Sequence, residues 1–497
     1  AFMNIPIDLL ITNAVIVNSG QTETGHIAVH GRQIVAIYSG AIHPNALPQA
    51  RTVIDAAGRT VIPGGVDGHC HVEQVTGSYE SLDTFEIAST AALWGGTTTI
   101  LDFGIPADSG ESPLEAAERK IRLSKVARCD VALHASVIRW DDSVPDQLEK
   151  LAHYGIRSVK LYTTNRGSTM ADDDTIMKVM KEMVRLDGLT YIHAEHDSII
   201  VDCLEESSRR GQVSVEHLHH TRPALAEAAS VHETLAMAEY AGAAVYFVHQ
   251  SIPEAVQLVQ DARARGVVAY SETCPHYLIF DESVYRSPTP ERFACCPPMR
   301  GRDAVDSLRE LALRGAVHTI ASDHTCYDVA QKESRKEDMH FVPYGMPGVE
   351  TRMPAAYTTL VTEGRMTTQQ FVEVFSAGPA RINGLPTKGV IAVGFDADLV
   401  IFDPAETRVV DGTALHMGTD YSPFDGIKLA GWPSTVIAAG RVVLEDGKFI
   451  DPGPIGRFLK CLGVREMADR LRNGDSPMCV TASTDSQLDY ALSDRVL

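Results

Sequence analysis

The chain has 497 residues and a formal net charge of −21, with 44% hydrophobic and 22% charged residues. These proportions are those of an ordinary globular protein, and the length exceeds what one hydrophobic core usually holds. We therefore expect one large domain and a smaller one. The strongly negative charge argues against nucleic acid and anionic membrane surfaces as partners.

Neither a membrane anchor nor a disulfide framework is expected. No apolar run is long enough to cross a bilayer, and residues 1–8 lack a basic stretch followed by an apolar one. The nine cysteines are scattered and odd in number, with no CxxC pair. We therefore expect reduced thiols in a cytoplasmic protein.

Both ends of the chain are predicted to form β-structure. Short strand-like stretches separated by turn residues occupy residues 8–17, 27–29, 33–38 and 52–55. Similar strand-like stretches separated by turn residues occur at residues 397–402, 435–439 and 441–444. We therefore predict a small β-sandwich domain formed by both termini, from residues 1–60 and 389–455.

The middle of the chain, residues 61–388, alternates strands and helices. Apolar strand candidates lie at 61–66, 97–103, 131–137, 158–162, 190–192, 244–248, 267–270 and 319–321. Helical patterns separate most of them, such as those at 113–126, 173–186, 223–241 and 253–265. Eight strands separated by helices predict an α/β fold, a (β/α)8 barrel of the TIM type. A doubly wound open sheet is the alternative, but its Gly-rich phosphate turn is missing after the first strand.

Residues 456–497 form a C-terminal extension beyond both predicted domains. The pattern predicts a helix over residues 457–472 and a polar segment from Asn473 onward. Such a tail either makes an oligomer contact with a neighbouring subunit or is flexible.

His69 and His71 follow the first barrel strand. Residues two apart in an extended segment point to the same face, so both imidazoles can reach one ion. Alone the pair is weak evidence, because most paired histidines are structural. Further metal-capable side chains lie at the ends of later strands, where barrels of this type carry their functional residues: Lys160, His193, His249 and Asp323.

Each of these residues has an ordinary structural explanation. Asp323 could cap a following helix, and Lys160 could be an ion-paired lysine. Five strand ends that all carry such a residue nevertheless favour a metal centre over coincidence.

Histidine nitrogens and carboxylate oxygens suit zinc, manganese, cobalt or iron. Six positions exceed the three ligands of a typical catalytic zinc and suit two bridged ions. An ammonium repels cations, but a lysine joined to carbon dioxide becomes a carbamate, which is an anionic bridge.

Several motifs now make the chain resemble the amidohydrolase superfamily, and within it the dihydropyrimidinase/hydantoinase group, over about residues 8–455. They are Ala-Ala-Gly-Arg at 56–59, Gly-Gly-Val-Asp-Gly-His at 64–69, Gly-Gly-Thr-Thr-Thr at 95–99, Glu-Thr-Cys-Pro-His-Tyr at 272–277, Pro-Pro-Met-Arg at 297–300, Pro-Gly-Val-Glu at 347–350 and Gly-Phe-Asp-Ala-Asp-Leu at 394–399.

The resemblance implies two divalent metal ions, with zinc as the expected metal, bridged by N6-carboxylated Lys160. One ion would be held by His69, His71 and Asp323, and the other by His193 and His249. It also implies that a metal-bridging hydroxide opens the C–N bond of a small cyclic amide or ureide, with Asp323 as general base and then acid. A homotetramer is common in the group.

The chain departs from the group at three substrate-binding positions. Asn165 stands where a Tyr is usual, Cys296 where a Ser is usual, and Tyr344 where an Asn is usual. These exchanges place dihydrouracil and simple hydantoin in question as substrates. They also leave open which group donates to the oxyanion, with Tyr344 and Tyr162 as alternatives. Cys70, where Thr is usual, is expected to have little effect.

Other functions within the superfamily remain alternatives. An allantoinase-like enzyme or a cyclic-imide hydrolase would use the same ligands. A dihydroorotase is disfavoured because no arginine clamp for a substrate carboxylate is obvious, Arg166 being the nearest candidate. A non-catalytic scaffold relative is disfavoured because every ligand position is filled.

Overall fold

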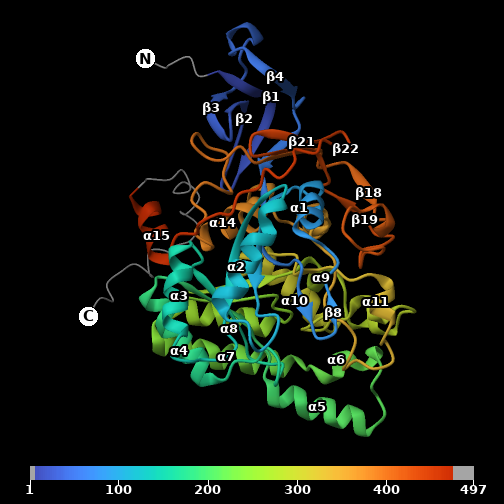
Figure 1. Cartoon of the computed structure of the whole chain (residues 1–497). Helices are drawn as coiled ribbons and strands as arrows, with labels where there is room; N and C mark the ends of the chain where they lie inside the picture. Colours follow the sequence, from blue (N-terminus) through green and yellow to red (C-terminus); the bar gives the residue numbers. More distant parts are fainter. Residues whose placement is uncertain (1–5, 474–497) are drawn as a thin grey trace.

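A computed structural model of the chain describes residues 6–473, and the ends of this stretch meet in one mixed sheet. Its nine strands have the order β22-β21-β20-β17-β5-β1-β2-β3, with β4 paired to β1. Figure 1 shows the blue N-terminal strands beside the red β21 and β22 at one end of the molecule. The strands are β1 (Ile7–Asn18), β2 (Gln21–His30), β3 (Gln33–Ser39), β4 (Ala50–Asp55), β5 (Thr60–Pro63), β17 (Leu399–Phe402), β20 (Pro433–Ala438), β21 (Arg441–Glu445) and β22 (Lys448–Phe449).

The second sheet is the predicted barrel. Its strands are parallel and run in the order β15-β14-β13-β12-β11-β10-β9-β6-β16. Because β15 pairs with β14 and β16 pairs with β6, residues 319–325 join the last strand to the first and close the ring. The strands are β6 (Gly65–His71), β9 (Thr97–Gly104), β10 (Asp130–Ser136), β11 (Ser158–Tyr162), β12 (Leu189–His193), β13 (Val245–Phe247), β14 (Ala269–Thr273), β15 (Thr319–Ile320) and β16 (His324–Thr325).

Helices cover the outside of the barrel (Figure 1). Those predicted from the apolar spacing are present, and α4 buries Ile176, Val179 and Met183 on one face. A capping box between Ser112 and Glu115 begins α2. The helices of this region are α1 (Phe85–Trp94), α2 (Pro113–Leu123), α3 (Val144–His153), α4 (Asp173–Arg185), α5 (Asp197–Arg209), α6 (Leu218–Thr221), α7 (Ala224–Ala241), α8 (Pro253–Ala264), α9 (Pro275–Ile279), α10 (Arg302–Leu313), α11 (Val329–Glu333), α12 (Arg352–Tyr357), α13 (Thr368–Val372) and α14 (Gly378–Ile382).

The single strand predicted over residues 61–66 is wrong, because the structure divides it between the two sheets. Residues up to Pro63 belong to β5, which pairs with β1 and β17. The chain then passes through Gly64, where a side chain would collide with Thr98, and enters the barrel as β6. His69 and His71 therefore lie inside the first barrel strand.

The helix predicted over residues 457–472 is present only in its second half, as α15 (Val464–Arg472). The preceding segment is extended along the start of β10, where the nitrogen of Val131 donates to the Arg457 carbonyl and that of Leu459 donates to the Val131 carbonyl. Asp187 caps α15 by accepting from the nitrogens of Arg465 and Glu466. The polar tail predicted beyond Asn473 lies outside the described residues.

Two smaller two-stranded sheets complete the fold: β7 (Val75–Thr76) with β8 (Tyr79–Glu80), and β18 (Thr407–Val409) with β19 (Lys428–Ala430). Over residues 6–473, every helix is too short or too polar to traverse a lipid bilayer.

Candidate metal centre

The structure brings the predicted ligands together at the carboxyl ends of the barrel strands. His69 and His71 lie on β6, and Asp323 lies between β15 and β16. Asp323 Oδ1 is 2.9 Å from His69 Nε2 and 3.3 Å from His71 Nε2. The two Nε2 atoms are 3.1 Å apart. Three donor atoms from opposite ends of the barrel sequence thus meet at one point.

His193, His249 and Lys160 lie beside this group. The rings of His193 and His249 are 4.6 Å apart between centroids, and those of His69 and His249 are 5.4 Å apart. Lys160 Nζ lies 4.7 Å from the centroid of Phe103. The six predicted residues therefore form one buried cluster, which packs against the ring of Phe103, a residue that was not predicted from the sequence.

Two of the ligand candidates have a backbone conformation that side chains rarely adopt. His249 has φ of 38° and Asp323 has φ of 50°. Left-handed conformations of residues other than Gly cost free energy and persist where the surroundings hold them. At His249 the backbone nitrogen donates to Glu272 Oε1 at 2.9 Å. Both residues therefore lie on strained turns that follow their strands, and the surrounding structure holds them there.

Three histidines are held by a side-chain oxygen on one ring nitrogen, which leaves the other nitrogen to face the centre. His69 Nδ1 lies 2.7 Å from Glu272 Oε1, and His193 Nε2 lies 2.7 Å from Glu195 Oε2. His71 Nδ1 pairs with Gln74. Outer partners of this kind fix the orientation and tautomer of metal-binding histidines. The sequence offered a signal for Glu272, which begins the Glu-Thr-Cys-Pro-His-Tyr motif, but none of comparable strength for Gln74.

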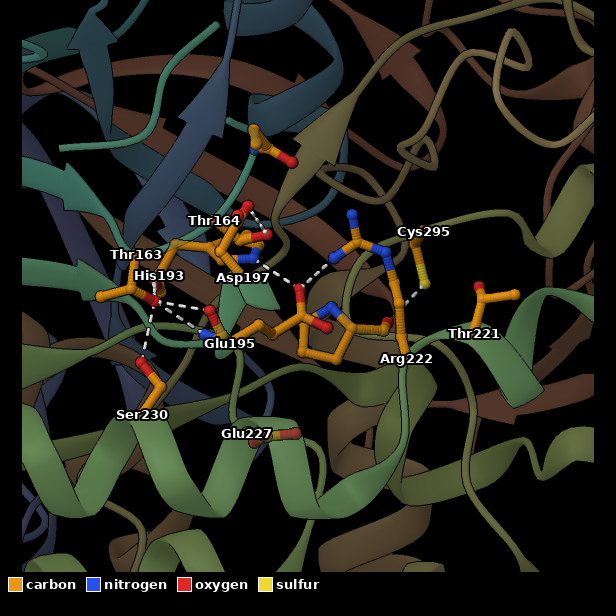
Figure 2. A network of polar contacts seen from close by, with 12 residues as sticks. Thr163, Thr164, His193, Glu195, Asp197, Thr221, Arg222, Glu227, Ser230 and Cys295 are labelled. Carbon is orange, nitrogen blue, oxygen red and sulfur yellow. Dashed lines mark hydrogen bonds and ion pairs between the residues drawn. The ribbon is translucent and has the colours of Figure 1, made fainter. Parts of the chain in front are cut away.

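Figure 2 shows the Glu195 carboxylate between His193 and Arg222. Thr163 holds the same backbone segment, since its Oγ1 donates to the Glu195 carbonyl at 2.8 Å and accepts from the Glu195 nitrogen at 2.9 Å. Burial raises the pKa of Glu195, but Arg222 and His193 outweigh it and lower the pKa to about 2. Glu195 is therefore ionised beside His193 at neutral pH.

The charges within the centre are strongly coupled. Burial lowers the pKa of His69, but the Asp323 and Glu272 carboxylates outweigh it and raise the pKa to about 9. Burial raises the pKa of Asp323, yet His69 and His71 bring it well below its usual range. Burial lowers the pKa of Lys160 to about 8, against the opposing effect of Asp323 and Glu272. The centre therefore combines a firmly ionised carboxylate with a lysine that readily gives up its proton.

The donor set fits divalent cations. Within residues 6–473, Lys160 Nζ and His249 Nδ1 are buried without a hydrogen-bond partner, which is costly for polar groups unless something else satisfies them. The donor atoms of His69, His71 and Asp323 lie within 4.8 Å of one another. Imidazoles with a carboxylate are the ligands of zinc and similar ions.

Two other carboxylate clusters in the described part of the chain have internal partners. In one, Asp83 Oδ2 accepts from His324 Nε2 at 2.7 Å, and His324 Nδ1 accepts from the Gly348 nitrogen at 3.0 Å. The other surrounds the Lys388 ammonium and consists of Asp130, Asp396 and Asp398. Neither cluster resembles the first centre, where polar atoms are left without partners.

Two of the predicted substrate contacts lie near Arg222, which pairs with Glu195 beside His193. The Arg222 guanidinium carbon is 5.8 Å from the centroid of the Tyr344 ring. Burial raises the pKa of the Cys296 thiol; Arg222 opposes this effect and Glu195 adds to it. The Tyr344 hydroxyl donates to the Met339 carbonyl at 2.5 Å. Tyr344 is thus connected to His193 through Arg222 and Glu195, and the Cys296 thiol lies in the electrostatic surroundings of the same Arg222–Glu195 pair.

The third predicted contact lies in the loop after β11. Asn165 has φ of 73°, and its side chain donates to Thr169 Oγ1 at 3.1 Å within the same loop. Its neighbour Arg166 pairs with Asp197 at 2.8 Å. Arg166, the candidate clamp for a substrate carboxylate, is therefore already paired with a carboxylate of the protein.

Comparisons with known proteins agree with this geometry. A model of the amidohydrolase family matches residues 60–443. A D-hydantoinase of Ralstonia pickettii is 36% identical over 458 residues, which cover 91% of this chain and 98% of the relative. A solved D-hydantoinase structure has a TM-score of 0.88 at 35% identity, covering 92% of this chain and 100% of the other.

A second solved structure, a dihydropyrimidinase from Brevibacillus agri, has a TM-score of 0.87 at 32% identity and covers 91% of this chain and 98% of the other. The family match over residues 60–443 includes all six ligand candidates. The chain belongs to the amidohydrolase family, and within it to the hydantoinase group.

Proposed function

We propose that the protein hydrolyses a ring C–N bond of a small cyclic amide or ureide, as a hydantoinase or dihydropyrimidinase does. The observation that carries the proposal is the meeting of Asp323 with His69 and His71 at 2.9 and 3.3 Å, beside His193, His249 and Lys160. The similarity to D-hydantoinases and a dihydropyrimidinase supports the same reaction. Such enzymes need a centre that activates water next to a carbonyl carbon.

The proposed cofactor is a pair of divalent cations, with zinc as the expected metal. His69, His71 and Asp323 would hold one cation, His193 and His249 the other, and carboxylated Lys160 would lie between them. Carboxylation is supported by the buried, unpartnered Nζ of Lys160. When bound, two such cations lower the pKa of water and polarise a carbonyl oxygen.

Asp323 is the proposed proton carrier. Its carboxylate is ionised, and its side chain retains 13% exposure, so it can reach a bound substrate. It takes a proton from the attacking water as the carbonyl carbon gains an oxygen. It then gives that proton to the ring nitrogen as the C–N bond breaks. The products are an acid and an amine, amide or urea nitrogen at the two ends of the opened ring.

Asn165, Cys296 and Tyr344 are the proposed substrate contacts. Cys296 and Tyr344 are supported by their proximity to Arg222, which is paired with Glu195 next to His193. Because the Arg222 charge is compensated by Glu195, the proposed substrate is a neutral ring. A location in the cytoplasm is supported by the eight cysteines of residues 6–473, which form no disulfide. A homotetramer is the proposed assembly, as is common in the group.

The test is ring opening of a panel of cyclic ureides, imides and lactams, with metal analysis of the same preparation. We expect turnover of hydantoins or dihydropyrimidines and about two metal ions per chain. The matched variant is Asp323→Asn, which keeps the shape of the side chain and removes its proton acceptor, and should reduce kcat at least about 100-fold. Preferred turnover of an allantoin-like ureide or a cyclic imide would favour the alternative substrates. A metal-loaded protein that opens no member of the panel would overturn the proposal.

A further inference from the structure

Lys332 is a buried lysine outside the metal centre that joins two separate loops. It lies on α11 and is fully buried. Its Nζ donates to the carbonyl of Pro343 at 2.8 Å and to the carbonyl of Ala294 at 3.0 Å. The ring of Tyr327 lies 5.7 Å away. Both acceptors are neutral carbonyls, whereas a buried lysine is usually paired with a carboxylate.

The two carbonyls belong to the segments that carry Cys296 and Tyr344. Ala294 precedes Cys296 by two residues, and Pro343 directly precedes Tyr344. The loops also touch each other directly, since the Gly345 nitrogen donates to the Ala294 carbonyl at 3.0 Å. Lys332 and Gly345 thus form two parallel links between the same pair of segments.

The helix that carries Lys332 is itself anchored to the rest of the fold. The helix α11 begins with a capping box between Asp328 and Gln331. The Val329 nitrogen donates to Asp420 at 2.9 Å, and Gln331 donates to the Glu80 carbonyl at 3.1 Å. Because α11 is anchored, the Lys332 side chain can hold the carbonyls of Ala294 and Pro343 at a defined separation. A lysine on a flexible segment would not do so.

Stability alone gives a poor account of this lysine. Removing an ammonium group from water is costly, and buried charged groups can often be replaced by apolar side chains of similar size without loss of stability. Lys332 makes only two hydrogen bonds to neutral carbonyls in exchange for this cost. These bonds fix the distance between the two loops. That distance concerns the reaction because the two loops carry Cys296 and Tyr344, the proposed substrate contacts.

We propose that Lys332 is a positioning residue that sets the separation of Cys296 and Tyr344 and thereby selects which cyclic substrates the pocket accepts. The inference rests on the proposed function, since it assigns those two residues to the substrate. Lys332 touches neither the substrate nor the ligand candidates. Its removal should therefore change selectivity and leave the metal centre intact.

The test compares Lys332→Met, Lys332→Gln and the control Lys336→Met in the metal-loaded enzyme. Met fills the space without donating, whereas Gln keeps N–H donors on a side chain that is one bond shorter. The first readout is hydrogen exchange, which should rise in residues 294–297 and 343–346 of Lys332→Met and stay near wild type in the other two variants. This readout does not depend on activity, and metal content should be unchanged.

The second readout is the ratio of kcat/KM for unsubstituted hydantoin to that for 5-phenylhydantoin. We expect it to change at least about tenfold in Lys332→Met, mainly through KM, and to stay within about threefold in Lys332→Gln and Lys336→Met. Unchanged exchange and an unchanged ratio in Lys332→Met would overturn the inference. If Lys332→Met does not fold, Lys332→Gln with wild-type exchange but an altered ratio overturns it equally. A wild-type enzyme that opens no ring contradicts the proposed function, and the exchange result still decides the role of Lys332.

Discussion

Glu272 Oε1 lies 2.7 Å from His69 Nδ1 and 2.9 Å from the backbone nitrogen of His249. One carboxylate on β14 thus orients two ligand candidates that come from different strands. A second oxygen of the same group accepts from the Tyr246 hydroxyl at 2.6 Å. Glu272 is completely buried and has its oxygens engaged, so it acts as a fixed support for the centre.

Glu272→Gln should weaken metal binding without unfolding the protein. The amide keeps the shape but cannot hold the His69 imidazole as a carboxylate does, and such outer partners typically contribute 10- to 100-fold to metal affinity. Titration with a metal chelator measures the effect. The matched control is Glu310→Gln, at a half-buried residue on α10 that pairs with Arg365. An unchanged affinity in Glu272→Gln would show that His69 needs no carboxylate to orient it.

Lys388→Met should destabilise the whole fold. The Lys388 ammonium lies 2.5 Å from Asp398, 2.7 Å from Asp130 and 2.9 Å from Asp396, all buried. Without it, the three buried carboxylates keep only the more exposed Arg32 and Arg457 as cationic partners, and breaking a buried ion pair costs about 3–5 kcal/mol. Urea unfolding measures the loss. A loss below about 1 kcal/mol, equal to that of the surface variant Lys448→Met, would contradict the expectation.

The stability of the protein should depend on pH through Lys332. Burial lowers the pKa of Lys332 to about 7, against the opposing effect of Cys295, Cys296 and Glu291. The unfolded lysine keeps its ordinary pKa, so between pH 7 and 10 the unfolded chain binds a proton that the folded chain has lost. The free energy of unfolding therefore rises with pH in this window, by at most about 1.4 kcal/mol per pH unit.

The difference between wild type and Lys332→Met isolates this contribution, because every other titrating group is common to both. Urea unfolding at pH 7 and pH 10 should show the wild type gaining stability relative to the variant. A constant difference over that range would mean that Lys332 keeps its proton in the folded protein.

Tyr344→Phe should change KM more than kcat. The hydroxyl donates to the Met339 carbonyl and the ring lies 5.8 Å from the Arg222 guanidinium carbon, so we expect the ring rather than the hydroxyl to contact the substrate. Removing the hydroxyl should leave kcat within about threefold of wild type. A fall of 100-fold or more in kcat, with KM unchanged, would instead assign the hydroxyl to the oxyanion that forms during attack. Steady-state kinetics with the best substrate of the panel distinguishes the two.

The barrel and its ligand positions could be predicted because each depends on a local pattern. An apolar run predicts a strand, and a polar residue within or at the end of that run is a candidate for the mouth of the barrel, as are Lys160 within β11 and His193 at the end of β12. The division at Gly64 could not be predicted in this way, since both halves of the run are equally apolar. It depends on which strands lie alongside, β1 and β17 on one side and β9 on the other.

The supporting residues of the site were missed for a related reason. Glu272 matters because it meets His69, which is 203 positions away in the chain. Lys332 matters because it meets carbonyls of two loops, and a carbonyl leaves no trace in the amino-acid sequence. Roles that arise from contacts between distant segments are visible only once the fold brings those segments together.

We propose that six side chains form a two-metal centre bridged by a carboxylated Lys160. The most direct measurement is the metal content of wild type and Lys160→Ala, with Lys181→Ala as a surface control, after identical dialysis. We expect about two ions per chain in wild type and in Lys181→Ala, and fewer than about one in Lys160→Ala. Adding a short-chain carboxylic acid should partly restore the metal content of Lys160→Ala. Two ions and full turnover in Lys160→Ala would contradict it.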